Sequence, residues 1–343
     1  MKYSRRSDNM HCLLAAAFAF ASTLPSLPAR AAPAGGVVTA GTGAIIQQGT
    51  TTTITQTASP RMVIDWKNFS TSSGESVVLR QPDASAIALN RVTGTSPSLL
   101  MGSLNANGQV FILNTNGVLF GPGAQVDVRG LLASTLAMDN AGFLRGSHVL
   151  EGGGAGTVVN QGRLTAADGG YIALVGPSVS NSGAISARLG DAVLMASDKV
   201  TVRMEGGSLA GYSIDRGSAD ALVNNSATGT ISASGGRVML AADAAGVLGR
   251  AVVNHDGLIE AQTLNRVEGS IRLLADARVG QLKVAGKLDA TAPGVGNGGH
   301  IETSGSRVQI DPGAVVDTRA ASGNGGTLLI DLLDFEITKE DAA

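Results

Sequence analysis

The fold is decided by residues 104–128, the stretch LNANGQVFILNTNGVLFGPGAQVDV. Two short apolar runs, residues 110–113 and 118–120, each follow an Asn-x-Asn-Gly tetrad, and a third run begins after Gly121-Pro122-Gly123. Valine, phenylalanine, isoleucine and leucine supply the surface that a strand needs. Asn-Gly pairs tolerate positive φ and mark tight bends. The stretch therefore predicts strand, turn, strand, turn and strand, and taken alone it would also fit a plain hairpin.

The two tetrads hold the candidate functional residues of the chain. These are Asn105, Asn107, Gly108, Asn114, Asn116 and Gly117. A turn asparagine can bond its own backbone two residues further on, and glycine accepts backbone angles that a Cβ forbids. We interpret both tetrads as tight turns.

Three neighbouring blocks give this stretch a wider context. They are residues 63–69 (VIDWKNF), 81–92 (QPDASAIALNRV) and 130–135 (GLLAST). In their order and their residues, these three blocks and residues 104–128 closely resemble the secretion domain of the filamentous haemagglutinin family, the exoproteins of two-partner secretion. The resemblance runs from about Gly36 to Thr135 and continues more loosely to the end of the sequence.

The resemblance implies a partner, a cognate outer-membrane β-barrel transporter that recognises the amino-terminal domain. Family members carry Asn-Pro-Asn-Leu and Asn-Pro-Asn-Gly motifs. The second matches residues 114–117, with Thr115 replacing the proline, whereas the first has only an analogue in residues 105–108. These motifs either contact the transporter or only hold turns, and both alternatives stay open. Host-cell or bacterial surface receptors are further candidate partners. Either the chain is a short family member or a longer effector region follows Ala343, and both alternatives stay open.

The first 31 residues are predicted to be a signal peptide. Lys2, Arg5 and Arg6 form a basic start, residues 13–24 form an apolar run, and residues 29–31 fit a small-x-small cleavage site. The apolar run is shorter than the roughly 20 residues that a membrane-spanning helix needs. The lone cysteine, Cys12, lies in this leader, so the mature chain is predicted to lack thiols. We expect a protein secreted or displayed at the cell surface by way of the periplasm.

From residue 158 the chain repeats one short sequence motif. Its apolar anchors are Leu164, Ile185, Ile231, Ile259, Leu288 and Val316, separated by 21, 46, 28, 29 and 28 residues. Strands and turns at such a period are typical of a solenoid. We predict an all-β fold, a right-handed parallel β-helix, with these anchors facing inward. The interval of 46 residues contains residues 199–207, which indicate an extra coil or a strand-pair excursion.

The amino-terminal third is less periodic than the rest. The resemblance implies that it caps the β-helix with extra antiparallel strands, and an open solenoid end would need such a cap. We therefore divide the chain into a signal peptide (1–31), a two-partner secretion domain with the cap and first coils (32–145) and β-helix repeats (146–343). Trp66 is expected to be a buried anchor of the cap.

Several polar residues invite a structural or a chemical interpretation. Recurring asparagines, Asn160, Asn181, Asn224 and Asn254, precede turn glycines and predict a hydrogen-bonded ladder along the axis. The mature histidines His148, His255 and His300 lie far apart, show no zinc spacing and are interpreted as solvated turn residues. Residues 294–299 satisfy Gly-x-Gly-x-x-Gly, but a strand is expected to follow where a dinucleotide site needs a helix.

Composition excludes several classes of function. Removing the leader takes away four basic residues and one acidic residue, so the formal net charge falls from -2 to about -5. This balance argues against nucleic acid and against a polybasic membrane anchor. No cofactor or metal is predicted. The alternative to a non-enzymatic exoprotein is a carbohydrate-active β-helix enzyme, a polysaccharide lyase or glycosidase, which a groove with paired carboxylates would favour.

Overall fold

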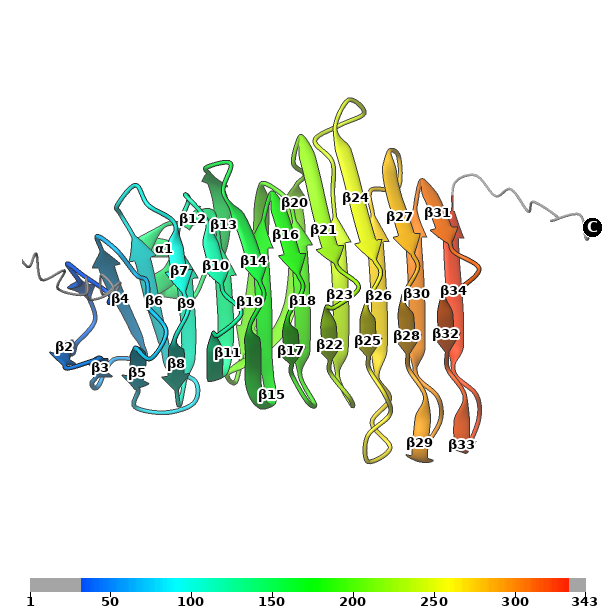
Figure 1. The fold of residues 1–343 in the computed structure, drawn as a ribbon, viewed down its shortest axis with the longest axis horizontal. Coiled ribbons are helices and arrows are strands. Elements are labelled where there is room, and N and C mark those ends of the chain that lie inside the picture. The colour runs from blue at the N-terminus through cyan, green and yellow to red at the C-terminus, as the bar shows by residue number, and fades with distance from the viewer. Residues whose placement is uncertain (1–31, 333–343) are drawn as a thin grey trace, which may run out of the picture. The chain divides into compact units, whose positions relative to one another are not determined.

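The structure is a computed structural model that describes residues 32–332, and the predicted signal peptide and residues 333–343 lie outside the described residues. The strands stack in chain order, one coil on the next (Figure 1). Nearly all neighbours along the stack pair in parallel, so the plain hairpin that residues 104–128 would fit when taken alone is not formed. Instead β9 (Gln109–Leu113) pairs with β6 (Ile87–Val92) and with β11 (Gln125–Ser134). The predicted parallel β-helix is confirmed.

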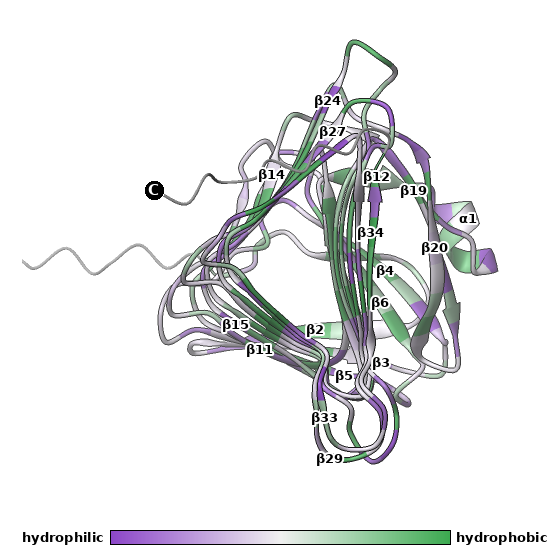
Figure 2. Ribbon diagram, turned by 90° about the vertical axis from the view of Figure 1, so that its right-hand side faces the viewer, coloured by the Kyte–Doolittle hydropathy of each residue, from purple (hydrophilic) through white to green (hydrophobic). Residues whose placement is uncertain are grey.

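Each coil contributes strands to three faces, which Figure 2 shows end-on. We call them faces A, B and C, and β11 and β15 (Arg163–Gly176) bend from A into B. Face A also contains β3 (Thr51–Gln56), β5 (Ser76–Arg80), β8 (Ser103–Ala106), β17 (Ala184–Ser186), β22 (Thr230–Ser232), β25 (Leu258–Glu260), β28 (Lys287–Asp289) and β32 (Val315–Asp317). Face B also contains β4 (Arg61–Trp66), β6, β9, β18 (Asp191–Ala196), β23 (Arg237–Ala242), β26 (Ser270–Ala275), β30 (His300–Gly305) and β34 (Thr327–Leu332). Face C contains β7 (Ser98–Leu100), β10 (Val118–Phe120), β14 (Thr157–Asn160), β16 (Ser178–Asn181), β21 (Asp220–Asn225), β24 (Arg250–His255), β27 (Gly280–Val284) and β31 (Arg307–Ile310).

The apolar anchors form one column inside face A. Leu164, Ile185, Ile231, Ile259 and Leu288 pair in register from coil to coil and are at most 2% exposed. Val316 continues the column and is partly buried. Burying each such side chain contributes roughly 1.5–3 kcal/mol relative to leaving it exposed. The predicted inward register of the anchors is confirmed.

A second layer covers the outer side of face B. It is an antiparallel sheet, which we call the outer sheet, of β12 (Leu136–Met138), β13 (His148–Gly153), β19 (Lys199–Glu205) and β20 (Ser208–Arg216). The 46-residue interval is therefore a strand-pair excursion rather than an extra coil. Because face B is buried on both sides here, its strands carry continuous apolar runs, as in the fully buried β18.

A short helix that the sequence analysis did not predict joins β12 to β13. Helix α1 (Asn140–Arg145) begins where the Asp139 carboxylate accepts a hydrogen bond from the Gly142 backbone nitrogen at 2.7 Å. It ends at Gly146, whose φ of 87° suits glycine. Its Phe143 is buried in the layer between face B and the outer sheet.

The amino-terminal end is closed by antiparallel strands, as predicted. Strand β1 (Val37–Ala40) pairs with β4, and β2 (Gly43–Gln48) pairs with β3, both antiparallel. Trp66 is 1% exposed and its indole nitrogen donates to the Asn90 side-chain oxygen at 3.1 Å, so its prediction as a buried anchor is confirmed. The predicted domain boundary at residue 145 stays a prediction, and strand pairing continues across it from β11 to β15.

The asparagine ladder exists with one correction of register. The side-chain nitrogen of Asn160 donates to Asn181 at 2.8 Å, and that of Asn181 donates to Asn225 at 2.7 Å. The fourth member is His255, whose Nδ1 lies 3.1 Å from the Asn225 amide nitrogen. The predicted members Asn224 and Asn254 were wrong, because they lie one position earlier and point away from the core.

The prediction for the three histidines was also wrong, and His300 is half-buried at the start of strand β30 rather than in a turn. His148 is 1% exposed and His255 is fully buried, so neither is a solvated turn residue. His148 lies in the layer under the outer sheet, where its ring centroid is 5.5 Å from that of Phe111. The glycine-rich residues 294–299 behave as predicted. They begin with the last two residues of β29 (Ala292–Val295), which pairs with β33 (Ala320–Ser322), and lead into strand β30 rather than into a helix.

Candidate functional site

The Asn114–Gly117 tetrad forms a tight turn at the corner between faces B and C. The Gly117 backbone nitrogen donates to the Asn114 carbonyl at 3.0 Å, which closes the turn. Gly117 has a φ of 128°, an angle that glycine adopts and other residues rarely do. The turn carries the chain from β9 on face B to β10 on face C.

Asn114 holds this turn from inside. Its side chain is fully buried, and its amide nitrogen donates to the Ser96 carbonyl and the Ser98 hydroxyl, both at 3.0 Å. Its side-chain oxygen accepts from the Asn116 backbone nitrogen at 3.0 Å and from the Asn116 amide at 3.1 Å. Every hydrogen-bonding atom of the Asn114 side chain is thus engaged within the protein.

The tip of the turn faces solvent. Asn116 is exposed and Thr115 is half-buried. The Asn116 amide still donates to the Gly94 carbonyl at 2.9 Å, which ties the tip to the preceding coil. Asn114 is therefore unavailable to another protein, whereas Thr115 and Asn116 are accessible.

The first tetrad is not a turn of the same kind. Asn105 lies within strand β8 and is exposed, and only Asn107 and Gly108 make the corner from face A to face B. Gly108 does not have a positive φ. It is glycine because a Cβ there would lie 2.7 Å from the Gln81 side chain and 2.8 Å from the Ala86 carbonyl. The structure thus confirms the bend and corrects its cause.

The two tetrads stand at opposite ends of β9. Five residues of strand separate corners by roughly 17 Å, so the six candidate residues do not form one cluster. Within the second tetrad the structure brings Asn114, Asn116 and Gly117 together. Asn105, Asn107 and Gly108 belong to the other corner.

A buried glutamine network at the first corner was missed. The Gln81 amide donates to the Ala86 and Gln109 carbonyls at 2.9 and 3.1 Å, and its oxygen accepts from the Gly108 nitrogen at 3.1 Å. Asn107 exchanges two hydrogen bonds of 2.8 Å with the Gln81 backbone. The Tyr171 hydroxyl adds a bond of 2.7 Å to the Gln109 side chain. A glutamine between a strand and a proline carries no local signal of such burial.

A pair of carboxylates does occur, on a shallow pocket far along the chain. Burial and a hydrogen bond with Asp276 raise the pKa of Asp243 to about 6. Burial alone would raise the pKa of Asp276, but hydrogen bonds from Arg278 and Asp243 hold it well below its usual value. No group of three or more potential metal-ligating side chains occurs in residues 32–332. Over the same range, no helix has the length and apolar character needed to cross a membrane.

Known proteins resemble this chain in sequence and in fold. A family model described as the TPS secretion domain matches residues 29–290. A heme/hemopexin-binding protein of Haemophilus influenzae strain Rd is 35% identical over 168 residues, 46% of this chain and 18% of that protein. A second heme/hemopexin-binding protein of Haemophilus influenzae is 44% identical over 77 residues, 22% of this chain and 8% of its own length. The matches thus span less than a fifth of these relatives.

Among solved structures, the HMW1 secretion domain from Haemophilus influenzae superimposes with a TM-score of 0.63 at 23% identity. The superposition covers 88% of this chain and 96% of that domain. At this identity the likeness concerns the fold, and it extends over nearly all of the described coils.

Proposed function

Because the chain belongs to the family of TPS secretion domains, we propose that it directs the export of an exoprotein through a cognate outer-membrane transporter. The observation that carries this proposal is the Asn114–Gly117 turn. It occupies the position of the family's second asparagine motif, presents an exposed tip and is held by a buried asparagine.

The hydrogen bonds separate the residues that shape the turn from those that are accessible to a partner. Asn114 and Gly117 shape it, since one is fully hydrogen-bonded inside and the other needs a positive φ. Thr115 and Asn116 are the residues that a transporter could contact. Contact with the transporter is then assigned to Thr115 and Asn116, and the structural role in the turn to Asn114 and Gly117.

We place the mature protein outside the cell. Residues 1–31 are proposed to be a signal peptide that takes the chain to the periplasm before the transporter exports it. An adhesin-like activity toward host-cell or bacterial surface receptors is proposed for the exported protein, in line with its likeness to haemagglutinins. The two relatives from Haemophilus influenzae are named heme/hemopexin-binding proteins, and we do not extend that binding to this chain.

We further propose that the chain is not an enzyme. Asp243 and Asp276 line the same shallow pocket, and Asp276 raises the pKa of Asp243, whereas a glycosidase needs both carboxyl groups free, one as an acid and the other as a base or nucleophile. Asp276 is also occupied by the backbone nitrogens of Arg278 and Val279, at 2.7 and 3.2 Å. The Asp276 carboxylate therefore stabilises the turn that follows it.

The test is co-expression with and without the transporter, measuring protein in the medium. Asn116→Ala is expected to lower export with a smaller fall in melting temperature than Gly117→Ala, because the hydrogen bond that it loses to the Gly94 carbonyl is exposed to solvent. Gly117→Ala is expected to lower both export and melting temperature, because alanine is strained at a φ of 128°.

A matched control is Asn254→Ala, which removes a half-exposed asparagine on face C. Lys287, although exposed, is a poor control because its ammonium lies 2.8 Å from the buried Asp289 carboxylate. Wild-type export of both turn variants, with the transporter present and required, would remove this turn from the mechanism.

A further inference from the structure

The outer sheet ends at a strand with a free edge. Among the described strands, β20 pairs only with β19, so no strand lies along its other side. Unpaired backbone groups along such an edge are a ready template for an added strand. The helical stack beneath continues past β20 through β26, β30 and β34.

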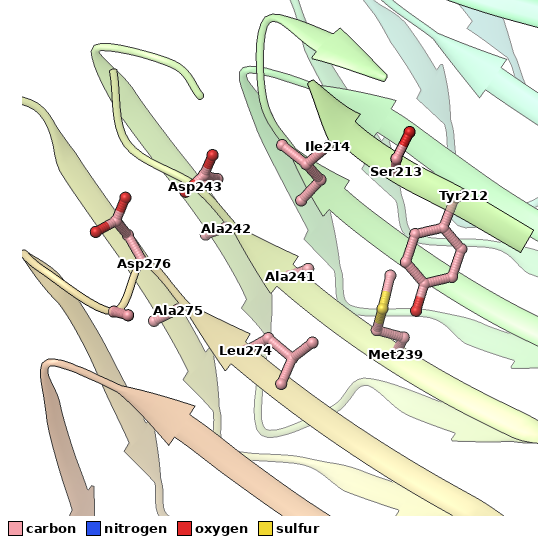
Figure 3. Close-up of a pocket in the computed structure, with 11 residues that line it drawn as sticks. Tyr212, Ser213, Ile214, Met239, Ala241, Ala242, Asp243, Leu274, Ala275 and Asp276 are labelled. Atoms are coloured by element: carbon pink, nitrogen blue, oxygen red, sulfur yellow. The ribbon is translucent and has the colours of Figure 1, made fainter. Parts of the chain in front are cut away.

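The surface beside this edge is apolar for the width of one strand. A pocket of about 360 Å³ is floored by Met239, Ala241 and Leu274 and walled by Tyr212 and Ile214 of β20 (Figure 3). Arg272 lies on the same strand as Leu274, beside Met239, and forms an ion pair of 2.8 Å with Glu302 of the next coil, where Ser304 stands beside Leu274. We call the floor formed by Met239, Ala241 and Leu274 the apolar strip. It extends from β20 only as far as one added strand would reach, because the next coil is polar.

One end of the strip carries an uncompensated acid. Asp243 and Asp276 lie at this end in Figure 3. Arg278 binds Asp276 at 2.9 Å, while Arg216, the nearest cation on β20, binds Glu151 at 3.1 Å. At the opposite end Arg237 binds Asp191 at 2.6 Å. Asp243 makes no ion pair within the described residues, and burial beside a second carboxylate keeps its pKa raised.

The direction of β20 relates this acid to the free edge. At the start of the strand, the Leu209 carbonyl accepts a hydrogen bond from Arg237, the first residue of β23. Just after its end, the Ser218 nitrogen donates to the Asp243 carbonyl at 2.8 Å. A strand antiparallel to β20 would therefore begin beside Asp243.

We propose that the free edge of β20 binds an extended peptide of a partner protein, antiparallel to β20, with two apolar residues at alternate positions over Leu274 and Met239 and a basic residue on Asp243, two positions before the first apolar one. Backbone hydrogen bonds to β20 would supply affinity, and the strip and the acid would supply specificity. This inference concerns the folded, exported protein and is independent of transporter recognition.

The chain itself contains the apolar part of this pattern in strand β19, with the sequence KVTVRME. On the occupied edge of β20 it places Lys199 opposite Arg216, Val200 opposite Ile214 and Val202 opposite Tyr212. Paired residues of neighbouring strands share a face. Lys199 itself alternates to the solvent face, where it binds Glu151 at 2.8 Å. A synthetic peptide Lys-Thr-Val-Thr-Val, with its valines in the register of Val200 and Val202 on the free edge, would direct the valines to the strip and its lysine to Asp243.

The test titrates the exported protein with this fluorescently labelled peptide and follows anisotropy at neutral pH. We expect saturable binding with Kd below about 1 mM and slowed hydrogen exchange in β20. Leu274→Glu in the protein and Lys→Glu in the peptide should each weaken binding by about tenfold or more. Asp220→Asn, which alters an exposed carboxylate at the start of β21, should leave binding unchanged.

The decisive comparison combines changes on both sides. If the peptide lysine meets Asp243, the Lys→Glu peptide should lose much less affinity for the Asp243→Asn protein than for wild type. Equal losses in the two proteins would overturn the assigned contact. Absence of saturable binding to wild-type protein at 1 mM peptide, or protection of another strand edge instead of β20, would overturn the site.

Discussion

Thr115 is the residue at which this chain departs from its family's motif. It occupies the second position of the Asn114–Gly117 turn, where the Asn-Pro-Asn-Gly motif that this stretch resembles has proline. Proline presets the φ that this position needs and reduces the freedom of the unfolded chain. The threonine therefore leaves the tip of the turn less constrained than a proline would.

Thr115→Pro is expected to raise the free energy of unfolding by about 0.5–1 kcal/mol. Urea denaturation of the purified protein would measure the change, with Thr115→Ala as the control that lacks the ring constraint. A loss of stability in the proline variant would show that the turn in this protein depends on the threonine backbone nitrogen or hydroxyl.

His148 should make stability depend on pH. Burial, followed by the charge of Arg61, lowers its pKa from 6.5 to about 4. Between these values the unfolded chain binds the proton and the folded chain does not, so stability is full above pH 6.5 and is lost as pH falls toward 4. The loss can reach about 3 kcal/mol.

Comparing wild type with His148→Leu at pH 7.5 and 5 isolates this effect. The comparison is needed because Asp243, whose pKa is raised to about 6, acts in the opposite direction between pH 6 and 4. We expect a smaller fall in melting temperature for the leucine variant on going to pH 5. The same fall in both proteins would mean that His148 is not the group that titrates.

At the scale of elements, strand pairing converts single polar residues into a ladder. Asn160, Asn181, Asn225 and His255 occupy the same position on four consecutive strands of face C. Each buried amide satisfies the next, so the ladder tolerates polar groups inside a core that is otherwise apolar. His255 ends it by bonding the Lys287 carbonyl at 3.0 Å.

Asn225→Ala is expected to cost about 1–3 kcal/mol, because it leaves the amide of Asn181 and the ring of His255 without their partner. Its neighbour offers a matched control, since Asn224 points outward on the same strand and Asn224→Ala should change stability by less than about 0.5 kcal/mol. Thermal or denaturant melts of both variants measure the two changes in stability. Equal effects would contradict the register of face C.

At the scale of the whole described unit, the amino-terminal cap protects two open edges. Strands β1 and β2 cover β4 and β3, which would otherwise present unpaired backbone to solvent. Removing residues 32–48 should therefore yield a protein that aggregates on concentration. Size-exclusion chromatography would detect this, and a monomeric truncated protein with an unchanged melting temperature would show that the cap is dispensable.

The sequence by itself determined the strand-and-turn pattern, the inward column from Leu164 to Leu288, the buried Trp66 and the turn at residues 114–117. These features follow from local chemistry, since apolar spacing selects the buried face and Asn-Gly selects the bend. Tertiary structure alone decided which of two adjacent asparagines enters the ladder, because a slip of one residue exchanges the faces of a strand. It also decided the burial of His148 and the free edge of β20, since both depend on the outer sheet, whose strands β12, β13, β19 and β20 meet across up to 80 residues of chain.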